Sequence, residues 1–335
     1  MSDPLQQAAA APNPAATGGR RGVPFDGEMT VLSRTTAAEG VVSLELGLPG
    51  GAALPSWAPG AHIDLALGNG LTRQYSLCGS VGNRASWRVA VLREQASRGG
   101  SAWIHANVNA GTRLRVRGPR NNFPLLPASR YVFIAGGIGI TPLLSMVAEA
   151  HASGADWAVH YGGRARARMA FIAELGSYGG RVALAPRDEG ARLDLASILR
   201  VPAVPTLVYC CGPSPLLEAA AAHCRAWPGN PLHVERFAAD PVGSQDNLPI
   251  EVELRASGMT IAVPPELSVL QAVENAGVYV LSSCAEGACG SCETTVLEGE
   301  VDHRDSVLGE DERAAGDTMM ICVSRAKSGR LVLDL

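Results

Sequence analysis

The spacing of four cysteines constrains this chain more than any other feature. Cys284, Cys289 and Cys292 follow the pattern C-x4-C-x2-C, and Cys322 stands in a separate downstream segment. This is the spacing of plant-type [2Fe–2S] centres, in which one loop wraps the cluster and a distant strand supplies the fourth thiolate. Small residues between the ligands let backbone amides approach the sulfides closely. The sequence therefore predicts a [2Fe–2S] cluster bound by these four thiolates.

Two other uses of the cysteines compete with this interpretation. Structural zinc favours two short ligand pairs, whereas here three cysteines lie together and the fourth stands apart. Disulfides are disfavoured in a compartment that keeps thiols reduced. Outside the four-cysteine pattern, Cys78 and Cys224 are expected to be ordinary small packing residues.

Length and composition narrow the class of protein. The chain has 335 residues, which suggests two or three domains, and its 47% hydrophobic and 18% charged residues are typical of a globular protein. With 28 basic and 32 acidic residues the net charge is −4, so no overall basic surface for nucleic acid is indicated. Lys327 is the single lysine, which leaves almost no place for Schiff-base or P-loop chemistry.

Neither a targeting signal nor a membrane span is expected. Residues 1–24 are rich in Ala, Pro and Gly without a charged start and an apolar core, so we expect a disordered tail. The apolar stretches 131–148 and 201–217 are interrupted by glycines and prolines and do not indicate continuous spans. We therefore expect a cytoplasmic protein that does not interact with a membrane.

The remaining chain divides into three folded parts. Short alternating strands between turn residues predict an all-β antiparallel barrel, with a domain at 25–126. Alternating strands and helices, including helices near 142 and over 165–174, then predict a parallel α/β sheet domain at 127–238. The polar segment 239–248 is expected to be a linker, and 249–335 a compact α+β module.

A glycine turn follows the first predicted strand of the α/β domain. Gly136, Gly137 and Gly139 precede Thr141 and Pro142, which are expected to be the N-cap and first turn of a helix. Glycines beside a helix start can let a cofactor approach, but the pattern departs from the G-x-G-x-x-G fingerprint. Cofactor binding and a plain turn are both open on this motif alone.

Two further motifs have the same ambiguity. Cys211, Gly212 and Pro213 also end a predicted strand and begin a helix. In the barrel region, Arg73 and Tyr75 share one strand face by period-two alternation, as an anionic phosphate and a flat ring would require. The alternative is a surface arginine beside a core tyrosine.

Taken in order, these motifs resemble a known family. R-x-Y-S-L, G-G-x-G-x-T-P and C-G-P resemble the ferredoxin–NADP reductase superfamily over about residues 25–238, and 282–292 resembles the cluster loop of plant-type ferredoxins. Together they resemble the phthalate dioxygenase reductase family, as do the segments 118–125 and 235–237. The resemblance implies an FMN-binding barrel, an NAD-binding α/β domain and a β-grasp ferredoxin domain.

The resemblance also implies a flavin site. FMN is expected rather than FAD, a choice that the residues alone do not make. Phe237 would cover the flavin until nicotinamide displaces it, the alternative being a buried strand residue. The other implied flavin residues are Arg73, Gln74, Tyr75, Ser76, Leu77, Val89, Val91, Gly99, Gly100 and Ser101.

For the nucleotide, the family implies NADH. Arg164, Arg166 and Arg168 near the expected adenosine ribose keep NADPH possible, because arginine there accepts a 2′-phosphate. The nicotinamide side would be lined by Gly136, Gly137, Gly139, Thr141, Pro142, Cys211, Gly212 and Pro213, with Arg164 near the ribose and Ser76, Thr141 and Cys211 as catalytic residues.

The expected function is the NADH-dependent reductase component of a two-component Rieske-type aromatic oxygenase, either a ring-hydroxylating dioxygenase or an O-demethylase. Electrons would pass from NADH to FMN, to the cluster and to the oxygenase. Transfer from a plant-type cluster at about −400 mV to a Rieske centre at roughly −150 to +300 mV is downhill. The alternatives are a reductase for a haem-thiolate or di-iron monooxygenase and a non-catalytic redox sensor.

Overall fold

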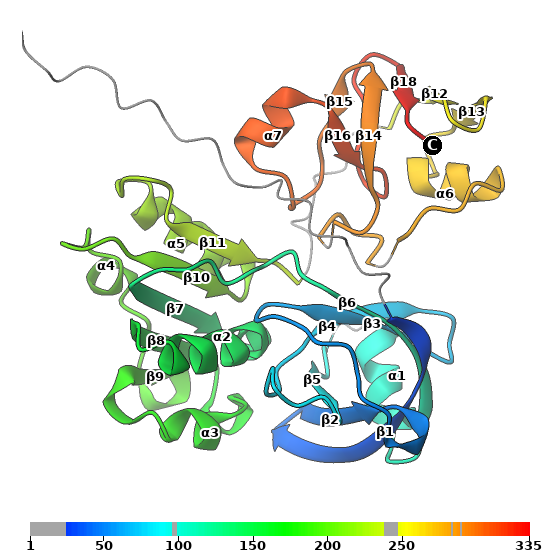
Figure 1. The fold of residues 1–335 in the computed structure, drawn as a ribbon. Helices are drawn as coiled ribbons and strands as arrows, with labels where there is room; N and C mark the ends of the chain where they lie inside the picture. The colour runs from blue at the N-terminus through cyan, green and yellow to red at the C-terminus, as the bar shows by residue number, and fades with distance from the viewer. Residues whose placement is uncertain (1–24, 96–98, 238–246, 283, 289) are drawn as a thin grey trace, which may run out of the picture.

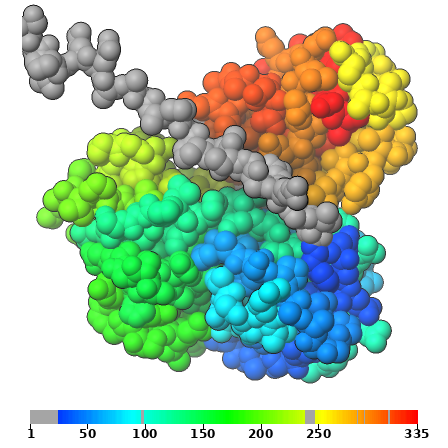
Figure 2. Space-filling view, viewed as in Figure 1, coloured from blue at the N-terminus to red at the C-terminus, as the bar shows by residue number. Residues whose placement is uncertain are grey.

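The computed structural model describes residues 25–95, 99–237, 247–282, 284–288 and 290–335. Three large sheets and one two-stranded sheet form three lobes, seen in ribbon form in Figure 1 and as surfaces in Figure 2. The predicted tail at 1–24, most of the predicted linker and Cys289 lie outside the described residues. Among the described residues, no helix combines the length and apolar character that crossing a membrane requires.

The first lobe is a six-stranded antiparallel sheet whose alternating apolar residues face inward. Its strand order is β4-β3-β6-β1-β2-β5. The Cys78 N–H donates to the Arg88 carbonyl at 2.9 Å, which joins the two ends of this order and curls the sheet into a barrel. The strands are β1 (Phe25–Ala38), β2 (Val41–Gly47), β3 (His62–Ala66), β4 (Thr72–Ser76), β5 (Trp87–Leu92) and β6 (Arg113–Arg120).

The barrel lobe is not purely β, so that expectation was wrong. Helix α1 (Gly100–Asn107) follows Gly99, which has a φ of 89°. Of the α1 side chains, Ile104 is fully buried in the barrel core and Trp103 packs against it. Because so few α1 side chains are buried, its apolar residues do not recur at helical spacing. The glycine pair at its start also favours a turn when only the sequence is considered.

The second lobe is a parallel sheet with the order β11-β10-β7-β8-β9. Separate hydrophobic clusters cover its two faces, as expected for a parallel sheet buried on both sides. Its strands are β7 (Arg130–Gly136), β8 (Asp156–Gly163), β9 (Val182–Pro186), β10 (Leu207–Cys211) and β11 (Leu232–Glu235). Its helices are α2 (Ile140–Ala152), α3 (Ile172–Gly176), α4 (Leu195–Ile198) and α5 (Ser214–Cys224).

The helical stretch predicted near 165–174 is present in part, but it is not one helix. The chain instead forms a short 3-10 helix at Arg166–Arg168 and then α3, separated by Phe171 with a φ of 62°. A left-handed residue ends any right-handed helix, and no glycine in this segment signals the change.

The third lobe contains a mixed sheet with the order β13-β12-β18-β14-β16 and a separate two-stranded ribbon, β15 with β17. Helix α6 (Val269–Asn275) begins at a capping box formed by Ser268 and Gln271, and its apolar face is buried against the sheet. The other elements are β12 (Ile250–Leu254), β13 (Met259–Val263), β14 (Glu293–Glu298), β15 (Val301–Asp302), α7 (Glu310–Ala315), β16 (Thr318–Met320), β17 (Arg325–Ala326) and β18 (Arg330–Leu333).

The barrel and the parallel-sheet lobe are in close contact at Gly60. A Cβ atom on Gly60 would lie 1.8 Å from the Phe123 carbonyl oxygen and 2.9 Å from the Met146 side chain of α2. Gly60 also has a φ of +87°. The Tyr209 hydroxyl fixes the same connecting segment by donating to the Pro124 carbonyl at 3.0 Å.

We predict that Gly60→Ala destabilises the protein much more than Gly40→Ala. Both glycines have positive φ, so each alanine costs about 1–2 kcal/mol of backbone strain. Gly40 has open space around its Cα, whereas Gly60 must displace backbone, which adds roughly 1–3 kcal/mol. Denaturant titrations of the two variants would measure the difference, and equal losses of stability would contradict the close approach.

Candidate functional site

The strand order places a crevice at one edge of the parallel sheet. The chain runs outward from β7 in both directions, so the order reverses between β7 and β10. In open parallel sheets, ligands bind beyond the carboxyl ends of the strands at this switch point. The glycine turn after β7 and the Cys-Gly-Pro turn after β10 both lie there.

Glycine is required where these two turns meet. A Cβ atom on Gly139 would lie 2.2 Å from the Cys211 carbonyl oxygen, and one on Gly136 would lie 2.7 Å from the Pro213 ring. The structure therefore brings together the residues expected on the nicotinamide side, and any larger side chain would push the turns apart. Gly137 has a φ of +57°, which also favours glycine.

The predicted role of Thr141 as an N-cap was wrong. Helix α2 begins at Ile140 and its N-cap is Gly139, because the preceding 3-10 turn runs directly into the helix. Thr141 is buried in the first turn, where its hydroxyl donates to the Ile138 carbonyl at 3.0 Å. Pro142 is buried beside it.

Three polar side chains from three strands meet near this crevice. The Ser76 hydroxyl at the end of β4 donates to Glu235 Oε2 at 3.4 Å, and Glu235 is paired in register with Cys211 across β11 and β10. Burial raises the pKa of Glu235 to about 8. Burial also raises the pKa of the Cys211 thiol well above its usual range. All three groups are therefore uncharged at neutral pH.

Glu235 was missed as a site residue by the sequence reasoning. The segment Glu235 to Phe237 carried the family resemblance, but only Phe237 received a role. An acidic residue at the end of a parallel-sheet strand was the available signal, since charged residues are seldom buried without a partner.

Beside these groups lies a cavity of about 180 Å³ to which all three lobes contribute. This volume is below the ~300–1,000 Å³ of a typical small-molecule pocket, so it suits part of a flat ring rather than a whole dinucleotide. Phe237 lies at its edge with 45% of its surface exposed, so the alternative of a buried strand residue was wrong. Lining residues include His62, Arg73, Tyr75, Ser76, Phe237 and Cys284.

One buried polar atom in this cavity fits the edge of a bound cofactor. His62 is 4% exposed, and within the described part of the chain its Nε2 atom has no hydrogen-bond partner. Burial, together with the Arg120 charge, lowers the pKa of His62 to about 4, so the ring is neutral. A neutral imidazole without a partner fits a cofactor that offers a hydrogen-bonding edge.

Arg73 supplies positive charge at the start of helix α1. A Cβ atom on Gly100 would lie 2.7 Å from Arg73 Nε, so the glycine lets the guanidinium cross the helix N-terminus. A cation and a helix N-terminus both favour an anion such as a phosphate. The neighbouring Ser101 hydroxyl accepts from the Glu94 N–H at 3.2 Å.

The other predicted flavin residues occupy different surroundings. Leu77, Val89 and Val91 are fully buried in the barrel core. Gln74 instead points toward the third lobe, where its amide donates to the Ser291 hydroxyl at 3.3 Å. This hydrogen bond joins the flavin-side strand to the cysteine loop.

Two of the three arginines near the expected ribose position form ion pairs. Arg166 pairs with Glu189 at 2.5 Å, and Arg168 pairs with Glu39 at 3.3 Å. Arg164 is exposed, and the structure gives it no ion pair among the described residues.

The three described cysteines of the predicted cluster come together. The Cys322 side chain is in hydrogen-bonding contact with both Cys284 and Cys292. The Gly287 N–H donates to Cys322 Sγ at 3.2 Å, and the Glu286 N–H donates to Cys284 Sγ at 3.3 Å. Inward-facing amides of this kind stabilise thiolates bound to iron.

In the described residues, which omit Cys289, no group of three His, Cys, Asp or Glu side chains could hold one ion. A two-iron cluster divides its thiolates between two iron atoms, so its ligands need not converge on one point.

A second loop supports the cysteine loop and was not foreseen. The Ser306 N–H donates to the Gly287 carbonyl at 2.8 Å, and the buried Asp305 accepts from the Leu308 N–H at 2.8 Å. A Cβ atom on Gly287 would lie 3.0 Å from the Asp305 Cα, so the two loops are in direct contact.

Comparison with known proteins agrees with this geometry. Residues 252–327 match the 2Fe-2S iron-sulfur cluster binding domain family. Phenoxybenzoate dioxygenase subunit beta of Ectopseudomonas oleovorans is 45% identical over 300 residues, which cover 89% of this chain and 94% of that protein. The solved structure of phthalate dioxygenase reductase is 37% identical with a TM-score of 0.72, covering 92% of this chain and 98% of that one. The chain belongs to the phthalate dioxygenase reductase family.

Membership of the phthalate dioxygenase reductase family confirms the predicted multi-domain fold and the oxidoreductase class. It also confirms the family's cofactors, FMN, NADH and a [2Fe–2S] cluster. An intact type IV self-sufficient cytochrome P450 monooxygenase is 46% identical with a TM-score of 0.84 over 92% of this chain. This chain spans only 41% of that larger protein.

We predict that Glu235→Gln changes how stability depends on pH. With a folded pKa of about 8 and an ordinary value of 4.5, Glu235 holds its proton in the folded state while the unfolded glutamate loses it. This contribution to stability is complete below about pH 4.5 and is lost as the pH rises through about 8. The stability of the glutamine variant has no such dependence on pH. Its free energy of unfolding should therefore rise relative to that of the wild type by on the order of a few kcal/mol between pH 5 and 9.

Denaturant titrations of wild type and Glu235→Gln across that pH range measure the difference. A gap between the two proteins that stays constant with pH would show that the folded protein does not raise the pKa of Glu235.

Proposed function

We propose that this chain is the NADH-dependent reductase component of a Rieske-type aromatic oxygenase. The observation that carries the proposal is the cavity in which Tyr75 and Ser76 of the barrel, Phe237 after β11 and Cys284 of the cysteine loop all take part. When bound, NADH supplies a hydride, FMN converts this electron pair into single electrons, and the cluster carries them onward.

In this proposal the barrel holds the flavin at both ends. Arg73 and the N-terminus of α1 would bind its phosphate, with Gly99 as the N-cap and Gly100 and Ser101 in the first helical turn. Tyr75 and Ser76, which line the cavity, would contact the isoalloxazine, and Leu77 would support them from the barrel core. Phe237 at the cavity edge would cover the open face of the ring. The exposure of Phe237 supports this role, because a ring at the pocket edge can move aside for nicotinamide.

The Glu235 and Cys211 side chains, which would lie beside the flavin ring, are protonated and uncharged at neutral pH. Below about pH 8 the proton stays on the Glu235 carboxyl, and the Cys211 thiol is also neutral. A hydride donor therefore meets a preorganised hydrogen-bonding set formed by Ser76, Glu235 and Cys211 rather than a carboxylate. Gly136 and Gly139 let the two turns that would line the nicotinamide pack directly against each other.

On the cluster side, we propose that Cys284 is the ligand nearest the flavin. Cys284 lines the cavity, and its charge acts on the buried His62 ring. The Gln74–Ser291 hydrogen bond and a hydrogen bond at 3.1 Å from Arg117 to the Tyr279 hydroxyl fix the third lobe against the barrel. Cys289, with Cys284, Cys292 and Cys322, completes the proposed ligand set.

NADH is the preferred nucleotide in this proposal. Arg166 and Arg168 already have acidic partners, which leaves Arg164 as the arginine available to a ribose substituent. One exposed arginine would bind the 2′-phosphate of NADPH only weakly, which favours NADH with its 2′-hydroxyl.

We also propose domains at 25–126, 127–238 and 249–335, joined by a linker at 239–248 and preceded by a tail at 1–24. Each proposed domain contains one of the three main sheets. A cytoplasmic location fits the requirement that the cluster thiols stay reduced.

The oxygenase partner has two candidates. A Rieske partner is favoured because transfer from a plant-type cluster to a Rieske centre is downhill and because the similar phenoxybenzoate protein is named as a dioxygenase subunit. A haem-thiolate monooxygenase is the second candidate, since the similar P450 protein contains a comparable segment in one chain.

We predict that Cys322→Ser separates two activities. Ferricyanide accepts electrons from the flavin directly, so NADH oxidation with ferricyanide should stay within about twofold of wild type. Reduction of cytochrome c, which needs single electrons from the cluster, should fall by roughly 100-fold or more because one thiolate ligand is lost. Cys224→Ser, a buried cysteine in the second lobe, is the matched control and should retain both activities.

Loss of both activities in a folded Cys322→Ser protein that retains FMN would contradict this division of roles. Equal rates of cytochrome c reduction in Cys322→Ser and wild type would contradict the proposed ligand.

A second prediction tests the partner. Reduction of a purified Rieske oxygenase by NADH and this chain should be at least about tenfold faster than reduction of a purified haem-thiolate monooxygenase, because of the downhill potential. Stopped-flow absorbance at equal partner concentrations measures both rates. The reverse order would favour the second candidate.

A further inference from the structure

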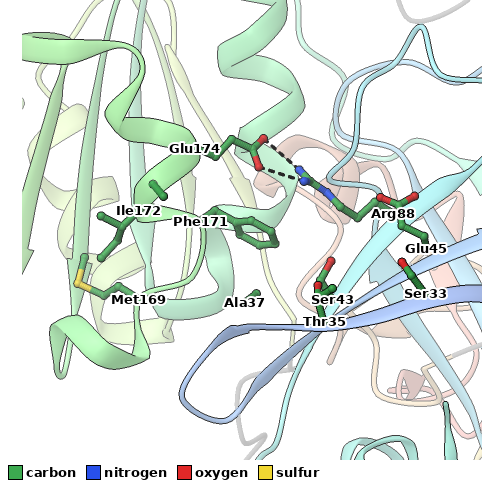
Figure 3. Close-up of a pocket in the computed structure, with 11 residues that line it drawn as sticks. Ser33, Thr35, Ala37, Ser43, Glu45, Arg88, Met169, Phe171, Ile172 and Glu174 are labelled. Carbon is green, nitrogen blue, oxygen red and sulfur yellow. Dashed lines mark hydrogen bonds and ion pairs between the residues drawn. The ribbon is translucent and has the colours of Figure 1, made fainter. Parts of the chain in front are cut away.

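Arg88 of β5 connects the barrel to the nucleotide lobe. Its Nη1 lies 3.0 Å from Glu174 Oε2 in α3, and its Nη2 donates to Glu174 Oε1 at 3.0 Å. Figure 3 shows Arg88 reaching from the barrel strand to both carboxylate oxygens of Glu174. Paired bonds of this kind fix orientation as well as distance.

The same guanidinium binds the end of the flavin-side strand. Arg88 Nε donates to the Cys78 carbonyl at 3.2 Å, and Nη2 donates to the same oxygen. The Cys78 N–H returns a hydrogen bond to the Arg88 carbonyl at 2.9 Å. Cys78 lies two residues after Ser76, so Arg88 links the strand that would contact flavin to α3 of the other lobe.

Phe171 adds a third contact. It precedes α3 with a φ of 62°, a left-handed conformation that is strained for a bulky residue. The Arg88 guanidinium lies 4.9 Å from the Phe171 ring centroid, and Figure 3 shows the ring beside the ion pair. Such strain persists only where neighbours hold the residue, which this cation–π contact does.

Other contacts also join the two lobes on this side. The Glu39 N–H donates to the Ala167 carbonyl at 2.8 Å, and Val41 and Ala90 of the barrel pack into the core of the nucleotide lobe. Arg88 adds the contact that reaches the end of the flavin-side strand. A cavity of about 450 Å³ separates the barrel strands from the segment around α3, with Ser33, Thr35 and Ser43 on the barrel side. The Glu39–Arg168 ion pair also joins the lobes, but its side chains are 62% and 45% exposed. Those of Arg88 and Glu174 are 21% and 46% exposed, so the Arg88 pair is less screened by water.

We propose that Arg88 is a positioning residue for NADH oxidation. With Glu174 and Phe171 it forms a clamp that fixes the angle between the two lobes. That angle brings Ser76 of the barrel to Glu235 of the parallel sheet, where the proposed function places the nicotinamide against the flavin. The inference rests on that proposed function.

The clamp has a specific kinetic consequence. The adenosine part of NADH binds on the nucleotide lobe, which the clamp leaves intact, so affinity for NADH is kept. Alignment of the nicotinamide depends on both lobes, and small misplacements of reacting groups slow a reaction strongly. Loss of the clamp therefore lowers the rate of flavin reduction at saturating NADH by about tenfold while the Kd changes by less than about twofold.

The test compares Arg88→Met and Glu174→Gln with Arg181→Met in the intact, cofactor-loaded protein. Arg181 is a matched control, because it pairs with Asp156 at 3.1 Å and lies 5.3 Å from the Trp157 ring centroid within a single lobe. Anaerobic stopped-flow absorbance gives the limiting rate and Kd. The long-wavelength absorbance of the nicotinamide–flavin complex reports alignment directly.

The expected result is a slower limiting rate and weaker long-wavelength absorbance in both clamp variants, with Arg181→Met like the wild type. Unchanged limiting rates in the clamp variants would overturn the inference, as would an equal loss in Arg181→Met. If Arg88→Met loses flavin or fails to fold, Glu174→Gln decides, because it keeps the Arg88–Cys78 bonds. A wild-type protein that does not oxidise NADH would instead contradict the proposed function.

Discussion

The hydrogen bond from Ser76 to Glu235 joins the barrel to the parallel sheet at the place where the other parts of the site meet. Ser76 ends the strand that contains Arg73 and Tyr75, and Glu235 pairs in register with Cys211. Burial keeps Glu235 protonated at neutral pH although the Ser76 hydrogen bond favours the carboxylate, so neither partner introduces a charge into the crevice. The cavity, the glycine turns and the cysteine loop are arranged around this contact.

The strand end that contains Ser76 is held from two sides. Ser76 faces Glu235, and two residues later Cys78 is bound by Arg88, which continues to Glu174. The third lobe is attached to the same strand through Gln74. One short strand thus contacts both the nucleotide lobe and the cysteine loop, which places residues of all three lobes at one site.

Sequence reasoning succeeded where local chemistry imposes a spacing. The cysteine pattern and the glycine turn were readable because ligands and close backbone approach each require particular residues at fixed intervals. It failed where the deciding contact is distant or the backbone is unusual. Thr141 is not the cap because a 3-10 turn precedes α2, and Phe171 interrupts a helix in a left-handed conformation. Glu235 and Arg88 were not recognised because their partners lie far away in sequence.

In the proposed function, flavin bound at the cavity that Glu235 and Cys284 line carries the electrons from NADH to the cluster. Rapid-freeze electron paramagnetic resonance after mixing with NADH tests it directly. In FMN-loaded protein, the signal of the reduced [2Fe–2S] cluster should appear within one turnover. In protein stripped of flavin but with its cluster intact, the signal should be absent on the same timescale. Equal cluster reduction in both preparations would contradict the account.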